Sequence, residues 1–188
     1  MENMFDMTDM NAMITGGGKG LGRGIAEGFL KEGANVIITG SSDAIYETEA
    51  EFKDAGYRGS IKAIHMDMLD RKQRGEAFDD CIEYFKGRLD VLVNNAGILI
   101  FQSFRTTPLK KIETLVMLHV VTMTKLCRLF AEDMCERGRG YILNMSSMSA
   151  WMAMPVSSAG PVKASMHSSA ALRYFSISFC ITSASGSA

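Results

Sequence analysis

Short apolar runs alternate with longer amphipathic stretches from the N-terminus to about residue 145. Five of these runs have the length of a strand and are bounded by Gly, Asp or Asn. Runs of this kind are typical of strands that are buried on both faces of a parallel sheet. The predicted strands are 12–15, 36–39, 61–66, 91–94 and 141–143.

The stretches between these runs have helical spacing. Residues 21–31 place their apolar side chains on one face, and residues 44–55 and 71–85 carry charges at helical intervals. A longer helix is predicted to open at Thr107-Pro108, with Pro in its first turn, and to run to about Cys135. Such alternation predicts an α/β fold, in which a doubly wound parallel sheet of the Rossmann type forms three α/β/α layers. We expect one domain over residues 1–188.

The composition narrows the functional classes. Hydrophobic residues make up 47% and charged residues 22% of the 188 residues, which is ordinary for a globular domain. A net charge of −1 gives no general attraction to nucleic acid or to an anionic membrane. No apolar run reaches the roughly 18 residues that a membrane span needs, and the polar start of the chain does not resemble a signal peptide.

Cysteines and other potential metal ligands show no pattern of a metal site. The four cysteines are widely spaced and form no Cys-x-x-Cys pair. We therefore expect no metal and no disulfide, and a reducing cytoplasm fits this usage.

The C-terminal stretch differs from the rest of the chain. No Asp or Glu follows Glu136, and ten of the residues from Ser157 to Ala188 are serine. Two interpretations stay open, namely a loosely ordered Ser-rich terminus and the damaged or frame-shifted end of a longer enzyme.

A glycine cluster follows the first predicted strand and opens the first helix. Gly16, Gly20 and Gly22 have the spacing Gly-x-x-x-Gly-x-Gly. Glycines allow the backbone to turn sharply and to approach a pyrophosphate, while the helix N-terminus supplies free N–H groups. The predicted phosphate-binding residues are Gly16, Gly18, Lys19, Gly20, Leu21 and Gly22.

Together with motifs downstream, this loop resembles the short-chain dehydrogenase/reductase family. Asn94-Asn95-Ala96-Gly97 closes the fourth strand, and Asp67 follows the third. Residues 137–147 are similar to the family's fifth strand, and the resemblance covers residues 10–155. It implies an NAD(P)-dependent oxidoreductase with a divergent tail at 156–188. The further cofactor contacts that it implies are Ser41, Asp67, Asn94, Ala96 and Gly97.

The end of the second strand favours NADP over NAD. NAD enzymes of this architecture usually place an acid there to bind the ribose hydroxyls. This chain has Gly40 and Ser41 instead, and Lys19 is positioned to attract a 2′-phosphate. A basic residue just before the second glycine is often linked to NADP in the family. The alternative for Lys19 is a solvated surface lysine.

The catalytic pattern of the family, which uses Asn, Ser, Tyr and Lys, is incomplete here. Ser147 matches the serine, and His119 stands at the asparagine position, where the alternative is a helix histidine packed beside its apolar neighbours. The tyrosine position falls on Gly160, and Lys163 lies one residue short of the lysine position at Ala164. Tyr-x-x-x-Lys is therefore absent.

Two functions remain. One is an NADP-linked oxidoreductase that acts on a small carbonyl or hydroxyl compound. The other is a catalytically impaired cofactor-binding pseudoenzyme or a truncated gene product, because family members run longer. In this comparison 177–182 corresponds to a sixth strand.

Relatives use the helices after the fourth and fifth strands as a dimer interface, so we expect a homo-oligomer. The helix from Pro108 to Cys135 carries more apolar surface than one sheet face needs. The residues that suggest this are Leu115, Val116, Leu118, Leu126 and Phe130.

Overall fold

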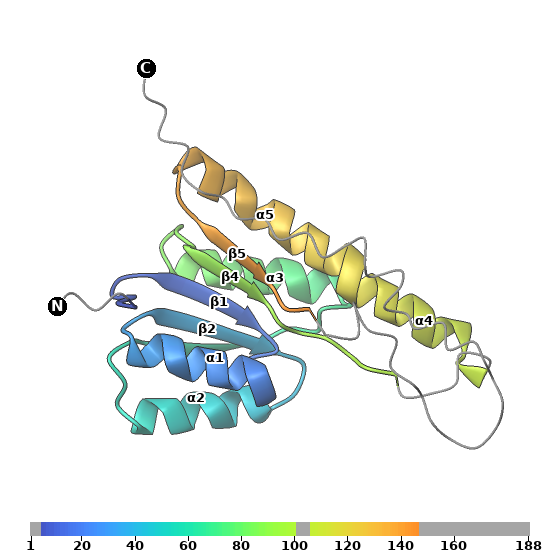
Figure 1. The fold of residues 1–188 in the computed structure, drawn as a ribbon, viewed down its shortest axis with the longest axis horizontal. Coiled ribbons are helices and arrows are strands. Elements are labelled where there is room, and N and C mark those ends of the chain that lie inside the picture. The colour runs from blue at the N-terminus through green and yellow to red at the C-terminus, as the bar shows by residue number, and fades with distance from the viewer. Residues whose placement is uncertain (1–4, 101–105, 147–188) are drawn as a thin grey trace.

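A computed structural model describes residues 5–100 and 106–146 of the chain. Within them, five parallel strands form one sheet in the order β3-β2-β1-β4-β5 (Figure 1). The chain winds outward from β1 to β3, then returns to place β4 on the other side of β1. The doubly wound sheet predicted from the sequence is confirmed. The strands are β1 (Asn11–Thr15), β2 (Asn35–Gly40), β3 (Ile61–His65), β4 (Val91–Asn94) and β5 (Tyr141–Asn144).

Helices cover both faces of this sheet. Figure 1 shows α1 and α2 on one side, and α3 and α5 on the other. The predicted helix ends agree with the observed ones to within about two residues, except that Pro108 precedes the helix instead of lying in its first turn. The helices are α1 (Gly20–Lys31), α2 (Ala44–Asp54), α3 (Arg71–Tyr84), α4 (Leu109–Val116) and α5 (Met123–Glu136), with a π-helical segment, Met117–Thr122, between α4 and α5.

Two apolar cores lie on opposite faces of the sheet because strand side chains alternate in direction. On β1, Ala12 and Ile14 pack into the core beneath α1 and α2, whereas Met13 packs into the core beneath α3 and α5. The prediction that every strand is buried on both faces holds for β1, β2 and β4. It is wrong for β3, where Lys62 is exposed, and for β5, where Tyr141 is 44% exposed. Both are edge strands of the described sheet, so fewer elements cover them.

The continuous helix Leu109–Glu136 is the longest apolar element of the described residues. It has 28 residues, and an 18-residue window in it has a mean hydropathy of 1.4, so by length and composition it qualifies as a membrane span. The sequence contains no uninterrupted apolar run of roughly 18 residues, and this window passes the test although polar residues interrupt it. A helix that packs in a protein core passes the same test, and α5 supplies residues to the core beneath α3 and α5. A single helix of this kind is weak evidence for a membrane.

Most of the apolar surface that suggested a dimer interface is used inside the domain. Leu115, Leu118, Leu126 and Phe130 are buried, whereas Val116 is 42% exposed. The argument from these residues is wrong for the four buried ones, because they pack in the core of their own chain. The apolar side chains that do remain exposed on this helix are Leu109, Val116, Met117 and Leu129.

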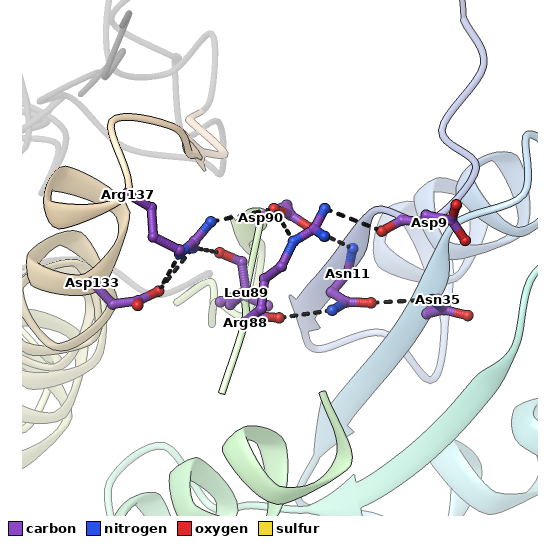
Figure 2. Close-up of polar contacts among 8 residues, drawn as sticks. All are labelled: Asp9, Asn11, Asn35, Arg88, Leu89, Asp90, Asp133 and Arg137. Carbon is purple, nitrogen blue, oxygen red and sulfur yellow. Dashed lines mark hydrogen bonds and ion pairs between the residues drawn. The ribbon is translucent and has the colours of Figure 1, made fainter. Parts of the chain in front are cut away.

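A buried carboxylate ties the central strands together at the N-terminal edge of the sheet (Figure 2). Asp90, which directly precedes β4, is fully buried. Its carboxylate accepts hydrogen bonds from the Asn11 backbone N–H at 3.0 Å and from Arg88 Nε at 2.9 Å. Arg137, at the end of α5, lies 3.5 Å from the same carboxylate and pairs with Asp133 at 2.8 Å. One side chain thus joins the starts of β1 and β4 to the end of α5.

Replacing Asp90 with Ala should destabilise the domain by about 1–3 kcal/mol, because the Asn11 N–H loses its acceptor and Arg88 and Arg137 each lose one of their partners. The measurement is urea unfolding followed by circular dichroism. Lys72→Ala is the control, since its pair with Glu76 is exposed on α3 and should change stability by no more than about 0.5 kcal/mol. Equal midpoints for the two variants would contradict the role given to Asp90.

Candidate functional site

The order of the strands reverses between β1 and β4, which are neighbours although two strands separate them in sequence. In open α/β sheets, ligands bind at the carboxyl ends of the strands where such a reversal occurs. The two segments that leave these strand ends are the glycine loop, residues 16–20, and the β4 loop, residues 95–100. These two loops form the candidate site.

The glycine loop requires its glycines for conformation and for space. Gly16 has φ +68°, and a Cβ there would lie 3.0 Å from the Ala96 Cα of the β4 loop. Gly22, in the first turn of α1, packs so closely against the carbonyl oxygen of Gly16 and the Asn95 side chain that a Cβ would overlap both. Only the absence of side chains lets the helix N-terminus close onto the end of β1.

The side chain of Asn95 holds the glycine loop from the β4 side. Its Nδ2 donates to the carbonyl oxygens of Thr15 at 3.0 Å and Gly16 at 3.2 Å. In return, Thr15 Oγ1 accepts from the backbone N–H groups of Asn95 and Ala96, both at 3.0 Å. Asn95 and Thr15 were not among the site residues predicted from the sequence. The signal was available, because adjacent residues at a strand end point to opposite faces.

Helix α2 holds the loop from the other side. Thr48 is buried, and its hydroxyl donates to the Gly18 carbonyl oxygen at 2.9 Å. A Cβ on Gly18 would come within 2.9 Å of the Ile45 side chain. The loop is therefore clamped between α2 and the β4 loop.

The open side of this clamp suits an anion. Lys19 is exposed and in an extended conformation as the N-cap of α1, and no acid lies in the first turn of that helix. A Cβ on Gly20 would meet no atom within 4 Å, and the Leu21 side chain is 73% exposed. The first N–H groups of a helix have no partners within it and carry partial positive charge. Backbone donors at this position can bind a phosphate.

Two further predicted residues lie at the same edge of the sheet. Ser41 directly follows β2 and is exposed. Asp67 follows β3, where one of its carboxylate oxygens accepts from the Leu69 N–H at 2.8 Å. Its own N–H donates to Gln73 Oε1 at 2.8 Å. The Asp67 carboxylate thus also shapes the turn before α3.

Asn94 points to β5 and α5, whereas Asn95 contacts the glycine loop. Its Nδ2 donates to Asn144 Oδ1 at 2.8 Å and to Cys127 Sγ at 3.2 Å. Its Oδ1 is buried and has no hydrogen-bond partner among the described residues. Burial raises the pKa of the Cys127 thiol, and the hydrogen bond from Asn94 acts in the opposite direction. The side chain of Asn94 therefore joins β4 to β5 and α5, and its predicted contact with cofactor remains a prediction.

Residues 5–100 and 106–146 contain two histidines, His65 and His119. His65 is exposed on β3, whereas His119 contacts the β4 loop. It lies in the π-helical segment, and such segments are frequent at functional sites. Its Nε2 lies 3.1 Å from the Ile98 nitrogen and 3.0 Å from the Ile98 oxygen. A Cβ on Gly97 would lie 2.7 Å from the ring. The ring therefore makes polar contacts with the β4 loop, which apolar packing beside its helix neighbours would not require.

The remaining predicted catalytic residues, Ser147 and Lys163, lie outside the described residues, as do the Ser-rich tail and the 177–182 segment. Within 5–100 and 106–146, no three His, Cys, Asp or Glu side chains form a group suited to a metal ion.

Gly22→Ala should destabilise the domain, because its Cβ cannot be accommodated without moving the backbone of Gly16. Gly28→Ala, in the same helix, is the matched control, since a Cβ there meets nothing within 4 Å. The control should gain about 0.5–1 kcal/mol of stability from its higher helix propensity. Thermal unfolding of the two variants tests this, and a stabilised Gly22→Ala protein would disprove the close approach.

Comparison with known proteins gives consistent matches. The sequence model of a family described as short chain dehydrogenase matches residues 10–166. L-rhamnose 1-dehydrogenase (NADP(+)) from Thermoplasma acidophilum is 34% identical over 151 residues, which cover 78% of this chain and 58% of that protein.

Solved structures agree with these matches. Gluconate 5-dehydrogenase from Burkholderia cenocepacia, in complex with NADP and tartrate, matches with a TM-score of 0.70 at 27% identity, covering 81% of this chain and 59% of that one. A 3-oxoacyl-[acyl-carrier protein] reductase from Brucella melitensis with bound NAD has a TM-score of 0.72 at 26% identity, covering 81% and 58%.

The chain spans between 24% and 58% of the lengths of the curated relatives it matches, and between 58% and 68% of the solved structures. The match to the family model nevertheless takes in β1 to β5 and both loops of the candidate site. This chain belongs to the short chain dehydrogenase family.

Proposed function

We propose that this chain binds NADP and belongs to an oxidoreductase that acts on a small carbonyl or hydroxyl compound. The observation that carries the proposal is the clamped glycine loop at the N-terminus of α1, with Asn95 on one side and Thr48 on the other. A bound nicotinamide cofactor would supply or accept a hydride. The contribution of the protein is to fix the backbone donors and leave open space above Gly20.

The residues present fit NADP better than NAD. No carboxylate lies at Gly40, Ser41 or Ser42, so none is placed to repel a 2′-phosphate at the end of β2. Asp43, which precedes α2, is the nearest acid in sequence and is exposed. Lys19 supplies an exposed positive charge at the glycine loop. The NADP named for the Thermoplasma and Burkholderia relatives supports this choice, whereas the NAD in the Brucella structure keeps NAD as the alternative.

For cofactor contacts we propose Gly16, Gly18, Lys19, Gly20, Leu21 and Gly22 at the phosphates, with Ser41, Asp67, Asn94, Ala96 and Gly97 at the other parts of the cofactor. For catalysis we propose Ser147 as the group that polarises the substrate carbonyl, with Lys163 and His119 as the remaining polar groups. The tyrosine of the family is missing from the sequence, so the alternative function is a cofactor-binding protein with little turnover.

We further propose a cytoplasmic homo-oligomer whose partners are small molecules and a second copy of the chain, not nucleic acid or membrane. The exposed apolar residues of α4, the π-helical segment and α5, which include Val116 and Leu129, support association through this helix.

NADPH should bind more tightly than NADH in isothermal titration. Lys19→Ala should weaken NADPH binding by about 10-fold or more, because a hydrogen bond to a charged group contributes roughly 1.5–3 kcal/mol, and should change NADH binding less. Lys31→Ala is the control, since Lys31 lies at the opposite end of α1 and pairs with Glu27. Gly16→Val should abolish binding of both cofactors. A preference for NADH, or equal loss in the two lysine variants, would contradict the NADP assignment.

The chain should reduce carbonyls slowly. Reduction leaves charge on the carbonyl oxygen, which needs a positioned donor, and the loss of a general acid costs roughly 10²–10⁴ in rate. NADPH absorbance with a panel of aldehydes, ketones and sugar acids measures this. Turnover near ~10 per second on any of them would show that another donor replaces the tyrosine. Grafting a Tyr-x-x-x-Lys segment and its C-terminal sequence from a relative onto residues 1–155 should raise the rate.

A further inference from the structure

One ring nitrogen of His119 contacts two backbone groups of opposite character. Nε2 lies 3.1 Å from the Ile98 nitrogen, which is a donor, and 3.0 Å from the Ile98 oxygen, which is an acceptor. A neutral imidazole nitrogen either accepts a hydrogen bond or donates one, and an imidazolium nitrogen only donates. The same atom therefore cannot satisfy both groups at once.

We propose that His119 is a positioning residue that holds the β4 loop in a proton-dependent way. With a neutral ring protonated on Nδ1, Nε2 accepts from the Ile98 N–H and fixes the loop beside Gly97. When the ring gains a proton, Nε2 carries hydrogen and turns to the Ile98 carbonyl oxygen. The Ile98 N–H then loses its acceptor and faces another N–H, so the hydrogen bond at this N–H is exchanged for one at the carbonyl oxygen.

No other titratable side chain lies on the described segments that meet at this contact. The β4 loop, residues 95–100, contains no titratable side chain, and neither does the rest of the π-helical segment. The strand end that follows, residues 142–146, has none either. Along the helix, the nearest charged residues in sequence are Glu113 and Lys125. Among the described residues, the polar contacts of His119 are those with Ile98, and imidazoles change charge between about pH 5 and 8.

An asparagine at this position would behave differently, because its Oδ1 accepts and its Nδ2 donates at the same time. His119→Asn can satisfy both Ile98 groups with separate atoms that do not titrate. His119→Phe keeps a ring beside Gly97 but offers neither donor nor acceptor. These two substitutions separate a proton-dependent contact from simple packing.

The test measures amide hydrogen exchange at Ile98 by NMR in the full chain without cofactor, from pH 8 to pH 5, corrected for the intrinsic rate. Wild-type protection should fall roughly 2- to 10-fold as the pH falls, the range expected for one hydrogen bond. His119→Asn should keep its protection throughout, and His119→Phe should lack it throughout. Ring ¹⁵N shifts should place the proton of the neutral ring on Nδ1. His65→Asn, which removes the exposed histidine of β3, is the control and should behave as wild type.

Protection that is unchanged by pH in the wild type, or lost equally in His119→Asn, would overturn the proposal. If His119→Phe does not fold, the wild type and His119→Asn still decide the outcome. NADPH affinity at pH 8 and pH 6 extends the test and rests on the proposed function. Between pH 8 and pH 6, the NADPH affinity of the wild type should fall more than the NADPH affinity of His119→Asn. The difference between the two falls should be at most about 10-fold, the upper limit for one hydrogen bond. If neither the wild type nor His119→Asn binds NADPH, the cofactor assignment is refuted. The hydrogen-exchange data would still test the contact between His119 and Ile98.

Discussion

The structure depends on one neighbour relation, the parallel pairing of β1 with β4, and side chains fasten that pairing at both ends. At the N-terminal edge, the buried carboxylate of Asp90 binds the first N–H of β1 and two arginines (Figure 2). At the C-terminal edge, Asn95 and Thr15 exchange hydrogen bonds across the strand ends. Ladder hydrogen bonds alone define the register between two strands, but they do not orient the segments that leave them. The two sets of side-chain hydrogen bonds orient these segments. The pairing of β1 with β4 therefore connects the candidate site to the opposite edge of the sheet.

The site itself is made mainly of backbone. Gly16 and Gly22 permit a contact that any side chain would prevent, and Asn95 and Thr48 fix the resulting loop through its carbonyl oxygens. Since those carbonyls are engaged by the protein, the loop presents N–H groups and a helix N-terminus to an incoming anion. The proposed pyrophosphate site therefore needs little side-chain charge, and Lys19 is the one cation within the glycine loop.

His119 and Asn94 are two polar residues near the β4 loop that bind different parts of the structure. The amide of Asn94 holds β5 and α5, whereas the ring of His119 holds the backbone of Ile98. Asn94 Nδ2 has two partners, whereas the polar contacts of His119 among the described residues are with Ile98 alone. The β4 loop is therefore tied firmly at Asn95 and through a protonatable group three residues later.

The sequence by itself determined the α/β class, the five strands, the position of the glycine loop and the resemblance that led to the family. These features follow from local information, because the hydrophobic period and the glycine spacing can be read directly from consecutive residues. Tertiary structure decided which strands have an open face, since Tyr141 is exposed only because β5 lies at an edge of the described sheet. It also decided that Leu118 and Phe130 serve the chain's own core. The same holds for the site, where Asn95 bonds a loop that lies about eighty residues away in sequence. Contacts of that kind depend on which strands become neighbours, and no local pattern contains that information.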